Sequence, residues 1–80
     1  MHRVLVLGAG KIGSLLSGLL AASGDYQVDL GDVNGHAAQA AAAGHKLANI
    51  KAHQIDAGNK DALEQHLKAH PADAVISSLP

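Results

Sequence analysis

The chain has 80 residues, enough for one small domain near the lower size limit of a self-supporting core. A net charge of −1 and a single aromatic residue, Tyr26, leave neither the basic surface nor the stacking platform that nucleic acids need. Without cysteine there is no disulfide and no thiolate metal site, and the apolar run Val4 to Leu7 is too short for a signal peptide or membrane span. We therefore expect a cytoplasmic protein with neither nucleic acid nor membrane as partner.

The first third of the chain predicts a strand, a helix and a second strand. Residues 3–7 form a continuous aliphatic run that Gly8 ends, which is typical of a strand buried on both faces of a parallel sheet. Residues 11–23 predict a helix that ends before Gly24. Its apolar residues recur at the helical period and predict the buried face: Ile12, Leu15, Leu16, Leu19 and Leu20. Residues 26–30 predict a short second strand.

The middle of the chain predicts a second helix and an edge strand. Asn34 is a good N-cap for a helix that continues through an alanine run to Gly44. Residues 50–55 alternate less cleanly and include Lys51 and His53, and polar residues on one side of a strand are typical of a sheet edge.

The last quarter predicts a third helix and a fourth strand. Asn59 can cap a helix over residues 60–69, with Leu63 and Leu67 facing inward and a Glu64–Lys68 pair facing outward. Pro71 follows the helix, and residues 74–77 form the fourth aliphatic run.

Strands that alternate with helices predict an α/β fold with a parallel sheet and right-handed crossovers. If the fourth strand returns to pair with the first, the strand order is 3-2-1-4 and the helices cover both faces of the sheet. This arrangement is half of a doubly wound, Rossmann-type fold, and it binds ligands where the strand order reverses. We therefore predict a single, partial dinucleotide-binding domain over residues 1–80.

A complete G-x-G-x-x-G motif lies between the first strand and the first helix. Gly8 allows the tight turn, Gly10 lets the backbone approach a pyrophosphate, and Gly13 lets the helix pack closely on the strand. The backbone N–H groups at the helix start, including those of Lys11 and Ile12, would face the phosphates.

An acidic residue follows the second strand, as a dinucleotide site requires. Asp32 lies 19 residues after Gly13, where its carboxylate could accept both hydroxyls of the adenosine ribose and would repel a 2′-phosphate. The rival acid, Asp29, lies inside the strand. Val33 stands where NADP-selective proteins often have arginine, so we predict NAD as cofactor. NADP stays open as the alternative, because Lys11, Lys46 or a residue outside this chain could meet a phosphate.

Four segments together resemble the N-terminal NAD(P)-binding domain of the saccharopine dehydrogenase family, over essentially the whole chain. They are residues 4–13, Asp32, residues 55–57, and residues 73–80 with their D-x-V-I-x-x-L-P pattern. The resemblance implies that the loop glycines and Asp32 hold the pyrophosphate and ribose, and that Asp56 lies by the adenine. It also implies that the C-terminal residues run under the nicotinamide-side ribose: Ser77, Leu79 and Pro80. From the residues alone, Asp56 is equally a turn residue before Gly58, and Ser77 a strand end satisfied by local hydrogen bonds.

The resemblance also implies an oxidoreductase that acts on an amino-acid-type C–N bond. Members of the family continue into a substrate domain that carries the catalytic residues, so we expect no catalytic residue here. We expect a fragment that binds the cofactor without turning over an amino-acid-like substrate. Half a Rossmann sheet also leaves the fourth strand as an edge, which predicts pairing into a homodimer.

Two other functions fit the same glycine loop. One is a regulatory NAD(H)-sensing domain of a potassium transport system, which the Ser-Ser-Leu-Pro ending disfavours. The other is a Rossmann relic whose glycines are purely structural.

The six histidines give a weak metal signal. His66 and His70 have the i, i+4 spacing of a helix face, but two ligands without a third make a poor zinc site. His70 also precedes Pro71, which disfavours helical geometry. We therefore predict no metal site, and we expect both imidazoles to stand at the helix end, where partial positive charge suits the dipole.

Overall fold

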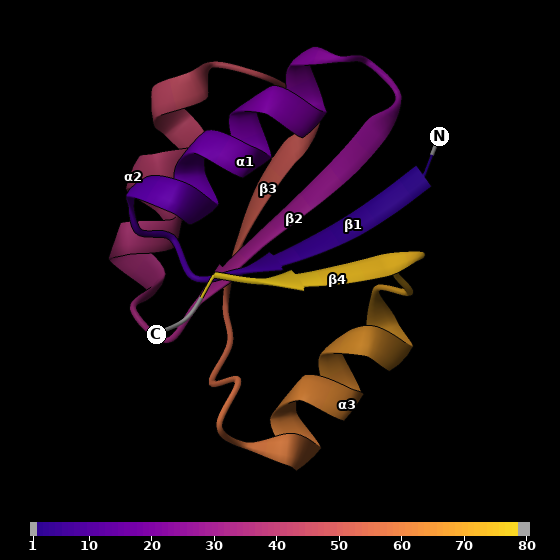
Figure 1. Cartoon of the computed structure of the whole chain (residues 1–80). Coiled ribbons are helices and arrows are strands. Elements are labelled where there is room, and N and C mark those ends of the chain that lie inside the picture. The colour runs from indigo at the N-terminus through magenta and orange to yellow at the C-terminus, as the bar shows by residue number, and fades with distance from the viewer. Residues whose placement is uncertain (1, 79–80) are drawn as a thin grey trace.

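A computed structural model describes residues 2–78 (Figure 1). Strands and helices alternate along the chain: β1 (His2–Leu7), α1 (Lys11–Ala22), β2 (Tyr26–Asp32), α2 (Gly35–His45), β3 (Ile50–Gln54), α3 (Lys60–Ala69) and β4 (Ala74–Ser77). None of these helices has the length and apolar character needed to cross a bilayer.

The four strands form one parallel sheet in the order β3-β2-β1-β4. Leu5 in β1 is the register partner of Asp29 in β2 and of Val75 in β4. Helices α1 and α2 cover one face, and α3 lies alone on the other (Figure 1). The predicted α/β fold, strand order and placement of helices on both faces are confirmed.

Side chains on the two sides of β1 belong to two separate hydrophobic cores. Val4 and Val6 pack with Val28, Leu30 and Ala21 under α1 and α2. Leu5 and Leu7 face the other way and meet Ile55, with Leu63 and Leu67 of α3 packed against them. The inward direction predicted for both leucines of α3 is confirmed.

The buried face of α1 differs from the predicted one. Three members of the aliphatic stripe are exposed: Ile12 at 67%, Leu15 at 59% and Leu19 at 62%. The buried residues of the helix are small: Gly13, Ser17, Gly18 and Ala21. Small side chains let α1 approach the sheet and α2 closely, and the His45 ring occupies the place where a Cβ at Gly18 would stand. Of the predicted stripe, Leu16 and Leu20 are half-buried and Leu20 packs against the core, whereas the other three members are turned away from the tight contact.

The helix ends show which local signals hold. Asn34 and Asn59 cap α2 and α3 as predicted, accepting hydrogen bonds from the N–H groups of Ala37 and Ala62, both at 3.1 Å. The stop predicted at Gly44 is wrong, because α2 runs on to His45 and ends at Lys46, whose φ of 54° is left-handed. Glu64 and Lys68 both face outward as predicted, but their pairing is wrong, since Glu64 faces Lys60 one turn earlier, at 3.9 Å.

Candidate cofactor-binding site

The first glycine of the loop makes the turn out of β1. Gly8 has a φ of 101°, a conformation that residues with a Cβ rarely adopt, and its N–H donates to the Gly31 carbonyl of β2 at 2.8 Å. Gly10 is the N-cap of α1, and a Cβ built there meets nothing within 4 Å. The space beside Gly10 is therefore open for a ligand to approach the backbone.

The third glycine is required by packing. A Cβ at Gly13 would overlap the carbonyl oxygen of Gly8 and lie 2.7 Å from the Ser78 hydroxyl. That hydroxyl points to the Leu7 and Gly8 carbonyls at 3.0 and 3.1 Å, which ties the end of β4 to the loop. Only glycine fits at position 13, because the start of α1 packs directly against the Gly8 backbone of the loop.

The N-terminus of α1 has the polarity of an anion site. Within Lys11–Ala22 the first turn contains no acidic residue, and no side chain among residues 2–78 caps the helix. The first amides of a helix have no intrahelical acceptor, and the helix dipole makes this end partly positive. Lys11 and Ile12, at the start of the helix, are both exposed. The loop thus presents donors and partial positive charge to solvent.

Asp32, at the end of β2, is bound to the loop by its own carboxylate. One oxygen accepts the Ala9 N–H at 2.7 Å, and the other accepts the Asn34 N–H at 2.9 Å. These two backbone hydrogen bonds, the one from Ala9 first, lower the pKa of Asp32 below its ordinary value, although burial opposes the shift. The side chain is ionised at neutral pH and keeps further lone pairs for a ligand.

A shallow, mainly apolar cavity of about 180 Å³ opens beside Asp32 at the carboxyl ends of β1, β2 and β3. Its walls come from these strand ends and the turns that follow: Leu7, Gly8, Gly31, Asp32, Val33, Ile55, Asp56, Ala57 and Gly58. Asp56 lines this cavity, and its carboxylate also accepts the Gly58 N–H at 3.0 Å. Asp56 is therefore a turn residue that stands at the cavity wall.

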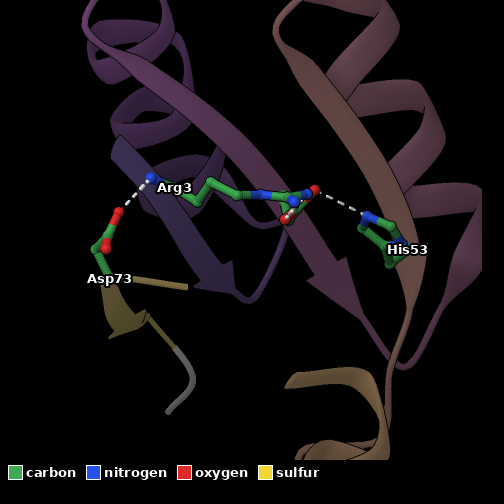
Figure 2. A network of polar contacts seen from close by, with 4 residues as sticks. Arg3, His53 and Asp73 are labelled. Atoms are coloured by element: carbon green, nitrogen blue, oxygen red, sulfur yellow. Dashed lines mark hydrogen bonds and ion pairs between the residues drawn. The ribbon is translucent and has the colours of Figure 1, made fainter. Parts of the chain in front are cut away.

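The remaining predicted residues have different places. Ser77 ends β4 beside Leu7 and is exposed, on the same rim as the loop. Leu79 and Pro80 lie outside the described residues. The rival acid Asp29 is buried on the α3 face, where the Arg3 guanidinium lies 3.4 Å and the His53 imidazole 3.0 Å from its carboxylate (Figure 2).

Sequence reasoning missed a cluster of histidines on that same face. His53 of β3 meets His66 of α3 and His70, the C-cap of that helix, with ring centroids 4.7 to 5.0 Å apart. As expected, His66 and His70 stand at the end of α3; we also expected both rings to be partly charged. Instead, burial first and then the neighbouring His53 and His70 lower the pKa of His66, which favours a neutral ring. The sequence signal for this cluster was His53, one of the polar residues of the edge strand β3.

Comparison with known proteins agrees with this geometry. A family model described as the saccharopine dehydrogenase NADP binding domain matches residues 4–80. The chain belongs to the saccharopine dehydrogenase family. The resemblance predicted from four segments, including residues 4–13 and 73–80, is therefore confirmed. The chain is a dinucleotide-binding domain of this oxidoreductase family.

A solved structure gives the same relationship. The chain is similar to apo histidine-tagged saccharopine dehydrogenase (L-Glu forming) from Saccharomyces cerevisiae, with 31% sequence identity and a TM-score of 0.83. The similarity covers 100% of this chain and 17% of the yeast chain. A comparison with curated protein sequences found no match.

Proposed function

We propose that this saccharopine dehydrogenase-family domain binds the adenosine-diphosphate half of NAD(H) at the rim formed by Gly8–Gly13, Asp32 and the neighbouring cavity. The observation that carries the proposal is the contact between Asp32 and the Ala9 amide, because it joins the ribose acid and the phosphate loop in one unit. The pyrophosphate would lie against the uncapped amides of α1, where Gly10 leaves room for it.

The ionised Asp32 supports NAD(H) over NADP(H). A carboxylate can accept hydrogen bonds from the 2′- and 3′-hydroxyls of the adenosine ribose, whereas a 2′-phosphate would bring like charges together. The next residue, Val33, is 62% exposed and offers no positive charge for that phosphate. The family description names NADP, so the preference of this member for NAD(H) over NADP(H) is the part of the proposal to test first.

The apolar cavity beside Asp32 suits the adenine. Its walls at Leu7, Ile55 and Ala57 are apolar, and Asp56 and the turn backbone at Gly58 provide polar groups at the edge. A flat base needs an apolar slot with a few polar groups that fix its orientation. Ser77, on the same rim, would lie toward the nicotinamide-side ribose.

The chemistry of the parent enzyme is a further part of the proposal. Kinship with saccharopine dehydrogenase supports hydride transfer at an amino-acid-type C–N bond, with this chain holding the cofactor and residues outside it holding the substrate. The 80-residue chain is expected to bind cofactor without catalysing that reaction.

The direct test is calorimetric titration of the 80-residue chain with NAD⁺, NADP⁺ and ADP-ribose. Losing the ribose hydrogen bonds should cost about 1.4 kcal/mol or more, so Asp32→Ala should weaken NAD⁺ about tenfold and bring NADP⁺ level with it. Val33→Arg, combined with Asp32→Ser, should reverse the preference. Asp25→Ala removes the same charge from the exposed turn before β2 and should leave all three affinities unchanged.

The outcomes separate the parts of the proposal. Equal binding of NAD⁺ and NADP⁺ by the wild type would refute the role of Asp32 and keep the dinucleotide site. Binding of none of the three ligands at millimolar concentration would show that the isolated domain does not bind the cofactor.

A further inference from the structure

A second candidate site lies on the opposite face of the sheet, beneath α3. Three histidines meet there: His53 from β3, His66 from the last turn of α3, and His70, the C-cap residue directly after that helix. One ring nitrogen of each lies within 4.8 Å of one from each of the others. None of the three lines the cofactor-side cavity, so this cluster is independent of the proposed cofactor site.

We propose that His53, His66 and His70 bind one divalent transition-metal ion of the zinc type. Imidazole nitrogens are good ligands for Zn²⁺, Co²⁺, Ni²⁺ and Cu²⁺, whereas Mg²⁺ and Ca²⁺ need oxygen donors. Three histidines with the fourth position left to water make a common zinc arrangement.

The unpartnered nitrogen of His66 is the second observation. His66 Nε2 is buried and has no hydrogen-bond partner among the described residues, and a buried polar atom is normally paired. Two other buried orphan nitrogens, Arg3 Nε and Gln27 Nε2, are donors and cannot ligate a cation. The His66 ring can present a lone pair, and a metal ion would satisfy it.

Asp29 holds the His53 ring for this role. The His53 Nε2 atom lies 3.0 Å from the Asp29 carboxylate, and a ring that donates there keeps its lone pair on Nδ1. A carboxylate that orients a metal-bound imidazole through its other nitrogen is the usual outer contact of histidine metal sites. Asp29 also offsets the nearby positive charge of Arg3, whose Nη2 lies 3.4 Å from it (Figure 2).

The spacing requires only a small adjustment. Metal–nitrogen bonds of about 2.1 Å bring ligand nitrogens to about 3.4 Å apart in a tetrahedron, so nitrogens that lie within 4.8 Å of one another must close by at most about 1.4 Å. Side-chain rotation can supply this, because His66 and His70 lie one helical turn apart and His53 is on the sheet edge.

The test is a zinc titration of the 80-residue chain, purified without a polyhistidine tag and treated with a chelator. Zinc is measured by competition with a chromophoric chelator, and Co²⁺ by the intense visible absorption of a tetrahedral site. We expect one ion per chain. His53→Gln, His66→Gln and His70→Gln should each weaken binding by more than the roughly 10- to 100-fold typical of an outer contact. His36→Gln, an exposed histidine of α2, is the matched control and should bind as the wild type does.

A measurement on the wild type keeps the test independent of how the variants fold. Adding one equivalent of Zn²⁺ should shift the imidazole nitrogen resonances of His53, His66 and His70 and leave those of His2, His36 and His45 in place. Absence of saturable binding, shifts at other histidines, or full affinity after loss of His53 would each overturn the proposal.

Discussion

The two faces of the sheet are built on different principles. Under α1 and α2 the contacts are made mainly by aliphatic strand residues and small helix residues, Ser17 among them, so the helices lie close. Under α3 the apolar core is smaller, and Arg3, Asp29 and His53 form a polar network beside it. The α1–α2 face therefore supplies most of the stability and fixes the cofactor loop, whereas the α3 face has polar groups that packing alone does not require.

The largest expected effect on stability comes from a substitution in the close-packed core under α1 and α2. Leu30 is fully buried, so Leu30→Ala should reduce the free energy of unfolding by about 3 to 4 kcal/mol, a large part of what an 80-residue domain possesses. Leu19→Ala is the matched control, because Leu19 is 62% exposed on α1 and should cost less than about 1 kcal/mol. Urea unfolding followed by circular dichroism measures both. Equal losses would mean that Leu19 packs inward, against its exposed position in this structure.

This contrast also shows how much of the fold could be predicted from the sequence. Strand runs, asparagine caps and the alternation of elements predicted the order of the sheet and the side of each helix. The stripe from Ile12 to Leu20 predicted only part of the buried face, because hydrophobic periodicity ignores how close two backbones come: Leu20 packs against the core, but Ile12, Leu15 and Leu19 are exposed. The burial of Gly13 and Gly18 could not be predicted, because it depends on close contact with Gly8 and His45. These partners become neighbours only in the folded chain.

The polar network gives an intermediate effect. Asp29 is 1% exposed, and Asp29→Ala would leave Arg3 and His53 without their shared carboxylate, at a cost of about 2 to 3 kcal/mol in unfolding free energy. Asp29→Asn should cost less, since its amide oxygen can still accept from His53. Asp73→Ala removes an exposed carboxylate that accepts the Arg3 N–H at 2.8 Å, and about 1 kcal/mol is expected. Thermal and urea unfolding of the three variants would contradict this ranking if Asp73→Ala were the most damaging.

The two sites differ in how visible they were in the sequence. The cofactor loop was predictable, because Gly8, Gly10 and Gly13 are contiguous and Asp32 follows at a fixed distance. The histidine cluster was not, because His53 and His66 come from different elements and meet only when α3 crosses beneath the sheet. The i, i+4 spacing rule identifies ligands only within one helix. The third ligand, His53, comes from β3, the strand that we had assigned to the sheet edge because of its polar residues.

The smallest expected effect concerns the bond between Asp32 and the cofactor loop. The Ala9 amide, and after it the Asn34 amide, lower the pKa of Asp32 in the folded state below its ordinary value of 3.8. A carboxyl with a lowered folded-state pKa contributes stability above its unfolded pKa and loses it as pH falls through the folded pKa. The wild type should therefore be more stable than Asp32→Asn at about pH 6, and the difference should shrink below about pH 4. Urea unfolding of both proteins across this range measures the difference, and a gap that stays constant down to the most acidic point would show that the loop does not depend on the charge of Asp32.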